Sequence, residues 1–167
     1  AAEVQKNAWL CFWTGQALLR IDEEQARIWF THAYCAFETS SDAVGIRLAA
    51  ASIVITFGLE HADLRELELW IRRHRDAGGE TPVAQNERFE TTLVMAIICA
   101  ALMQGAYPPT IEAHYLIPRL QQLLELDNVW LSDDQRVQAG RLLITHARIF
   151  RGEIEAPNAI VATRRLI

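Results

Sequence analysis

Cysteine and lysine are scarce in this sequence. The only cysteines are Cys11, Cys35 and Cys99, an odd number that cannot all pair within the chain, and no Cys-x-x-Cys motif is present. Each cysteine lies in an apolar run, so we expect reduced, buried thiols in a cytoplasmic protein. Lys6 is the one lysine among 16 basic residues, and we assign no function to that bias.

Signals for strands, membrane spans and secretion are missing as well. No Asn-Gly or Asp-Gly turn stands between alternating apolar residues, which argues against β-hairpins. The longest apolar stretch, 93–103, is shorter than the roughly 20 residues that span a bilayer. The N-terminal residues carry no signal-peptide pattern. Because the sequence lacks an initiator methionine and stops at Ile167 without a polar tail, we expect a domain of a longer protein.

Motifs of the common enzyme classes are also missing. There is no Gly-x-Ser-x-Gly, no phosphate-cradling glycine loop and no His-Glu-x-x-His, and Gly78-Gly79 is typical of a turn. Neighbouring acidic residues at 22–24 and 133–134 fall at predicted helix starts, where the helix dipole favours them. We therefore predict that the chain is not an enzyme and has no catalytic, cofactor-binding or metal-binding residues.

Three short patterns have a possible chemical use, and a structural interpretation is favoured for each. His32 and Cys35 have a spacing that can hold a metal, but no second ligand pair accompanies them. His61 with Asp63 is typical of a helix start. The basic run 72–75 can contact phosphate or an acidic partner, whereas a solvated helix end is the favoured interpretation.

Helical periodicity is present throughout the chain. The hydrophobic fraction of 51% and the charged fraction of 22% fit one ordinary domain in which helices bury wide faces. Capping residues and turn residues divide the chain into about eight helices. The predicted helices span about 3–19, 22–38, 43–59, 62–76, 86–104, 110–126 and 132–151, with a last one from 158. Asp22, Asn86, Thr110 and Ser132 are the predicted caps, and Pro118 is expected to kink its helix.

The first helical hairpin resembles the tetratricopeptide (TPR) motif. Gly15 is followed by Ala26, Phe30 and Ala33, and in the TPR family small residues let two helices approach while an aromatic ring fills the space between pairs. The spacing from Gly15 to Ala26 is one residue shorter than the family's usual pattern. Cys11 stands where the family commonly has tryptophan, and the family's final proline is missing. This specific resemblance covers about one quarter of the chain.

The rest of the chain resembles the family only as helix pairs. Gly140 and Ala147 give a second small-residue match, and the hairpins recur about every 40 to 46 residues. The longer repeats are similar to the helical-repeat segments of large bacterial regulators of the maltose-regulon-activator type. The resemblance implies an all-α fold over residues 1–167, in which antiparallel hairpins stack as one right-handed TPR-like α-solenoid domain.

Such a fold implies a function in recognition. We expect a non-catalytic protein-interaction or regulatory module of a bacterial, cytoplasmic signalling or transcription-control protein. The expected partner is a protein or peptide, with self-association as a further expectation. A net charge of -5 disfavours direct nucleic acid binding, and no membrane contact is expected. For the five tryptophans, packing between helix pairs is favoured over a binding hot spot: Trp9, Trp13, Trp29, Trp70 and Trp130.

Two other functions remain as alternatives. One is an effector-sensing domain in which the helical groove closes on a small molecule, with the apolar helix 86–104 and the kink at Pro118 as a pocket wall. The other is a helical enzyme, which requires a buried cluster of titratable side chains.

Overall fold

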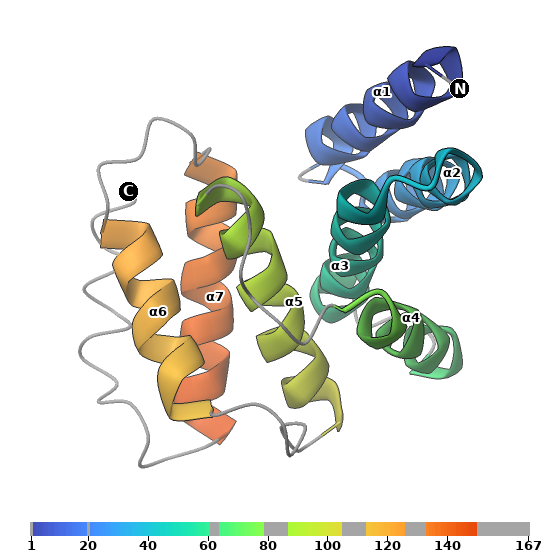
Figure 1. Cartoon of the computed structure of the whole chain (residues 1–167). Coiled ribbons are helices and arrows are strands. Elements are labelled where there is room, and N and C mark those ends of the chain that lie inside the picture. Colours follow the sequence, from blue (N-terminus) through green and yellow to red (C-terminus); the bar gives the residue numbers. More distant parts are fainter. Residues whose placement is uncertain are drawn as a thin grey trace. The chain divides into compact units, whose positions relative to one another are not determined.

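The computed structural model describes residues 2–19, 21–60, 64–78, 87–104, 113–125 and 133–149. Every regular element within these ranges is an α-helix, and they contain no strand (Figure 1). The predicted all-α class is therefore confirmed for the described part of the chain. The helices group into two compact units, Ala1–Pro82 and Val83–Ile167, and each unit is described by itself.

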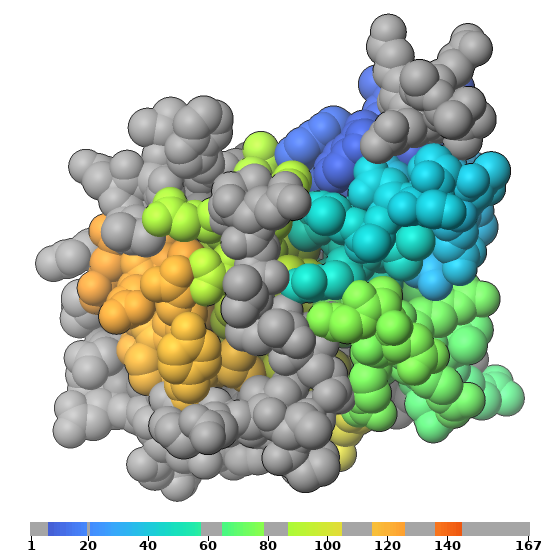
Figure 2. Space-filling view, in the orientation of Figure 1, coloured from blue at the N-terminus to red at the C-terminus, as the bar shows by residue number. Residues whose placement is uncertain are grey.

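The N-terminal unit contains four helices whose packing follows their order in the chain. They are α1 (Ala2–Leu18), α2 (Glu23–Ser40), α3 (Ala43–Glu60) and α4 (Leu64–Asp76). Each helix packs chiefly on the next one, and α1 also contacts α3. In the space-filling view the side chains of α2, α3 and α4 form a continuous surface (Figure 2). The predicted bounds of these helices agree with the structure to within two residues.

Aspartates cap the second and third helices, and the first of them, Asp22, is a predicted cap. The Asp22 carboxylate accepts a hydrogen bond of 2.9 Å from the Gln25 backbone N–H at the start of α2. Ser41 adopts a left-handed conformation with φ 55°, which ends α2. The Asp42 carboxylate then accepts from the Gly45 N–H at 2.9 Å and starts α3. Two residues thus suffice to reverse the chain between α2 and α3.

Glycines bring α1 and α3 close to the rings of α2. A Cβ atom on Gly15 would lie 2.7 Å from two ring carbons of Phe30, a distance at which side chains cannot coexist. A Cβ on Gly45 would meet the ring of Phe37 still more closely. Both rings are fully buried. The small residue in each flanking helix is therefore what lets α2 pack between α1 and α3.

The interior of the N-terminal unit is centred on α3. Every side chain from Leu48 to Phe57 is buried, as the almost wholly apolar sequence of this helix predicts. In α4 the buried stripe contains Leu67, Trp70, Ile71 and His74, and the rest of the described side chains are exposed or half-buried.

The described residues of the C-terminal unit form three helices, each in contact with the other two. They are α5 (Glu87–Gln104), α6 (Ala113–Glu125) and α7 (Asp133–Ile149). Side chains 91–101 of α5 are all buried. Pro118 lies within α6, as predicted, and its side chain is exposed. The predicted caps Asn86, Thr110 and Ser132 and the eighth helix, from 158, lie outside the described residues.

The length and hydropathy of the helices also bear on whether they can span a membrane. None of the helices in the described ranges combines the length and the hydropathy needed to cross a bilayer.

Candidate interaction surface

The most exposed apolar side chains of α1 lie on one side of the helix. Leu10 is 67% exposed and Trp13 is 38% exposed, and Ala17 is exposed as well. Together with the half-buried Thr14 they occupy positions i, i+3, i+4 and i+7 of one helical surface. We call these four residues the α1 face. The opposite side of α1 is buried in the unit, through Ala8, Phe12, Gly15 and Leu19.

The α1 face carries no charge and little unused hydrogen-bonding capacity. Residues 7–19 contain no Asp, Glu, Lys or Arg. The Thr14 hydroxyl donates a hydrogen bond of 2.9 Å to the Leu10 carbonyl one turn earlier, so its polar group is already satisfied within the helix. Covering this face would therefore remove apolar area from water without burying a charge or an unpaired hydroxyl.

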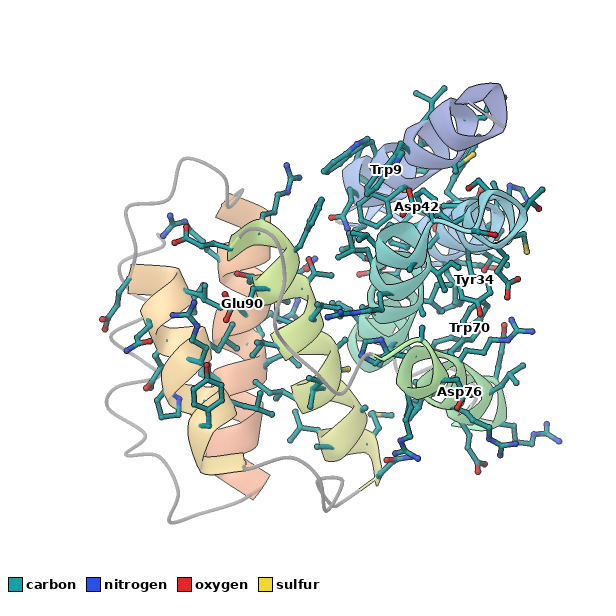
Figure 3. All side chains as sticks on the ribbon, in the orientation of Figure 1. Trp9, Tyr34, Asp42, Trp70, Asp76 and Glu90 are labelled. Atoms are coloured by element: carbon teal, nitrogen blue, oxygen red, sulfur yellow. The ribbon has the colours of Figure 1, made fainter. Side chains whose placement is uncertain are left out.

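A cluster of aromatic rings supports Trp13 from below. Trp13 stacks on Trp9 with ring centroids 6.3 Å apart and meets the edge of Phe12 at 5.2 Å. Trp9 in turn packs against Phe37 of α2 at 4.9 Å (Figure 3). These contacts hold the exposed ring in place. The sequence pattern predicts that both tryptophans pack between helices. Trp9 agrees with that prediction, whereas Trp13 packs on rings of its own helix and is 38% exposed.

A second aromatic cluster joins α2 to α4. Tyr34 and Trp70 meet edge to face at 5.1 Å (Figure 3). The Arg73 guanidinium lies over both rings, 4.6 Å from Trp70 and 5.5 Å from Tyr34. Burial raises the pKa of Tyr34, and the nearby Glu38 carboxylate raises that pKa further, while Arg73 opposes the shift. The neutral phenol is therefore the favoured form in the folded protein.

The prediction of a solvated basic run at 72–75 is only partly right. Arg72 and Arg75 are exposed, and Arg72 lies 3.7 Å from Glu68 in an exposed ion pair. His74, in contrast, is only 3% exposed, and Arg73 is half-buried on the aromatic rings. The physical reason is the helical period, because His74 follows Trp70 and Ile71 by one turn and shares their buried side.

The C-terminal unit has polar contacts that tie its helices together. Arg119 of α6 forms a bidentate pair with Glu90 of α5, with N–O distances of 2.6 and 2.7 Å. This hydrogen bonding raises the pKa of Arg119. An Arg136 N–H of α7 donates to the Leu124 carbonyl near the end of α6 at 2.8 Å. Sequence reasoning missed these contacts, because partners separated by 29 or 12 residues are brought together only by tertiary packing.

The two residues whose spacing could hold a metal, His32 and Cys35, lie at the surface of α2. Both His32 and Cys35 are exposed, and His32 meets the edge of Trp29 at 5.9 Å. In the described part of the chain no group of three His, Cys, Asp or Glu side chains is placed to hold a metal ion. His61 and Asp63 lie outside the described residues, and so does Trp130.

The prediction that all three cysteines are buried is wrong for Cys35. Cys99 is buried, Cys11 is half-buried and Cys35 is exposed, and all three are free thiols. Ala33, Tyr34 and Phe37 turn to the inside of the unit, so the helical period places residue 35 on the outside. An apolar run in the sequence did not reveal which of its members faces solvent.

Comparison with known proteins gives no relative. Neither the protein-family models, nor the curated proteins, nor the solved structures match this chain. The functional argument therefore depends on the geometry described above, in which exposed Leu10 and Trp13 share one side of α1 in a segment without charge.

Proposed function

We propose that this chain is a non-catalytic protein-interaction module of a bacterial, cytoplasmic signalling or transcription-control protein. The observation that carries the proposal is the α1 face, where exposed Leu10 and Trp13 lie in a segment, residues 7–19, that has no charged side chain. Tryptophan is enriched among the residues that dominate binding energy in protein interfaces. An exposed apolar face whose tryptophan, Trp13, is held in place by Trp9 is suited to contact with another protein.

The proposal includes a TPR-like α-solenoid as the scaffold. Sequential packing of α1 to α4 supports it, because each repeat of a solenoid contacts mainly its neighbours. The contact of a glycine with a phenylalanine ring occurs twice, between Gly15 and Phe30 and between Gly45 and Phe37. These repeated contacts support a regular stacking of helices, with the TPR-like arrangement as the proposed form.

Site-specific photo-crosslinking in cells tests the interaction. A benzophenone amino acid replaces Trp13 in one variant and Glu24, which is exposed on α2, in a matched control. We expect a discrete protein adduct from position 13 that is missing from position 24. Equal adducts at both positions, or none at position 13, would contradict an interaction through the α1 face.

A thermal-shift screen separates this proposal from effector sensing. A small molecule that binds the folded chain at 100 times its dissociation constant stabilises it by about 2.7 kcal/mol. We expect no comparable shift with metabolites. A saturable shift with a metabolite, together with no adduct at position 13, would favour the effector-sensing function instead.

A further inference from the structure

We propose that the partner of the α1 face is a second copy of this chain, bound by antiparallel packing of one α1 helix against the other. The inference rests on the proposed function, since it names the partner of the same surface. The α1 face is short, and its four members are arranged so that the face is complementary to itself.

The complementarity follows from the order of large and small side chains along the helix. Under a two-fold axis between residues 13 and 14, Leu10 of one copy faces Ala17 of the other, and Trp13 faces Thr14. Each large side chain thus meets a small one in both directions. Ridges of one helix can then enter the grooves of the other, which is how helices pack closely.

The distribution of charge also favours contact between two copies through the α1 face over contact through other parts of the surface. The chain has a net charge of -5, so two copies repel each other unless they meet where charge is lacking. The described outer side of α2 carries exposed carboxylates at Asp22, Glu24 and Glu38. Residues 7–19 have none, so packing this segment of one copy on the same segment of the other buries no charged side chain of the segment.

The face is already ordered before it is covered. Trp13 is held by Trp9 and Phe12, and the Thr14 hydroxyl is bonded to the Leu10 carbonyl. Fixing the Trp13 ring on binding therefore costs little side-chain entropy, and the Thr14 hydroxyl is not left unpaired. A single helix-on-helix contact is small compared with the interface of a permanent dimer, so we expect a dissociation constant on the order of 10 µM.

Analytical ultracentrifugation of the whole 167-residue chain over a concentration series measures this equilibrium. Leu10→Lys and Ala17→Glu are each expected to weaken dimerisation by roughly 30-fold or more, because each buries an unpaired charge. Leu69→Lys changes an apolar residue of α4 that is 44% exposed, and this control variant is expected to dimerise as the wild type does. Circular dichroism checks that each variant keeps its helices.

The double variant L10K/A17E tests the antiparallel register. Residues 10 and 17 are about 10.5 Å apart along one helix, too far for a direct pair within a chain. In the proposed dimer the new lysine of one copy lies beside the new glutamate of the other, so we expect the double variant to recover at least about tenfold of the lost affinity. An equimolar mixture of the two single variants should form the mixed dimer.

Three results would overturn the inference. They are a wild-type chain that stays monomeric up to several hundred micromolar, a dimer that L10K leaves unchanged, and a double variant with no recovery. If the chain is monomeric but position 13 still crosslinks a different protein, the second copy is excluded while the proposed function stands. If position 13 crosslinks nothing and the chain is monomeric, both fail.

Discussion

The two units of the chain fill their interiors in different ways. The N-terminal unit packs phenylalanine rings of α2 directly on glycines of α1 and α3, and adds clusters of aromatic rings around them. The C-terminal unit buries mainly aliphatic side chains of α5, α6 and α7, and joins α5 to α6 by the pair of Glu90 with Arg119. The first arrangement depends on the shape of a few residues, whereas the second depends on total apolar volume and on polar contacts such as this pair.

This difference has a consequence for exposed surface. In the N-terminal unit, α1 packs on α2 with lesser contact to α3, and the face with Leu10 and Trp13 stays open. In the C-terminal unit, α5 contacts two helices and has no exposed side chain between residues 91 and 101. Exposed apolar side chains also occur on α6 and α7, at Tyr115 and Val137, so what distinguishes the α1 face is that Leu10 and Trp13 share one side of a segment without charge.

The largest effect is expected from removing a ring that α1 and α3 share. Phe37→Ala takes away a fully buried ring that contacts Trp9 and lies against Gly45, and it should destabilise the fold by about 3–5 kcal/mol. Leu120→Ala in the aliphatic interior of the C-terminal unit is the counterpart, and it should destabilise the fold by about 2–5 kcal/mol without changing the contact of Trp9 with Phe37. Urea unfolding followed by far-ultraviolet and near-ultraviolet circular dichroism measures both. An unchanged aromatic signal in Phe37→Ala would contradict the shared role of the ring.

A smaller loss is expected from adding one carbon at a glycine. Gly45→Ala places a Cβ against the Phe37 ring and should cost roughly 2 kcal/mol, although alanine in a helix is intrinsically better than glycine by about 1 kcal/mol. Phe37→Leu in the same chain makes room, so G45A/F37L should be less unstable than the two single changes predict when added. Additive losses, measured by the same urea titrations, would show that the close contact is unimportant.

The polar link of the C-terminal unit should contribute less. Glu90 and Arg119 are 14% and 27% exposed, so Glu90→Gln should cost about 1–2 kcal/mol, most of it coupled to Arg119. A double-mutant cycle with Arg119→Gln measures that coupling. Glu68→Gln removes one member of a pair in which both side chains are about two-thirds exposed, and a loss of only about 0–0.5 kcal/mol is expected. Equal losses of stability on breaking the Glu90–Arg119 pair and the Glu68–Arg72 pair would refute the idea that burial makes the first pair the stronger one.

The sequence predicted what depends on neighbours along the chain. Helix bounds, the cap at Asp22 and the burial of Leu48–Phe57 in α3 follow from local pattern, and the structure agrees with them. The exposure of Cys35 follows from the packing of α2 among other helices, so an apolar run alone could not settle it.

Some missed features nevertheless left a signal in the sequence. His74 continues the spacing of Leu67, Trp70 and Ile71, which identifies the buried side of α4. Gly45 interrupts an apolar helical pattern, and such a glycine often marks a close approach of another element. The pair of Glu90 with Arg119 left no comparable signal, because both residues are ordinary members of helix surfaces until α5 and α6 meet.

A further small effect concerns Arg73, which lies on the aromatic rings while Arg72 in the same basic run is exposed. Arg73→Ala removes a guanidinium that covers Trp70 and Tyr34 and should lower the free energy of unfolding by about 1 kcal/mol, against about 0–0.5 kcal/mol for Arg72→Ala.

The raised pKa of Tyr34 makes the stability of the fold depend on pH. The contribution of the neutral Tyr34 phenol to the free energy of unfolding is fully present below the ordinary tyrosine pKa and is lost as the pH rises through the higher folded value. Since Arg73 lowers that pKa, its removal should steepen the loss of stability above about pH 10, and Tyr34→Phe should abolish this loss. Urea titrations between neutral and alkaline pH measure these slopes, and identical slopes in wild type and Tyr34→Phe would show that ionisation of this ring does not affect folding.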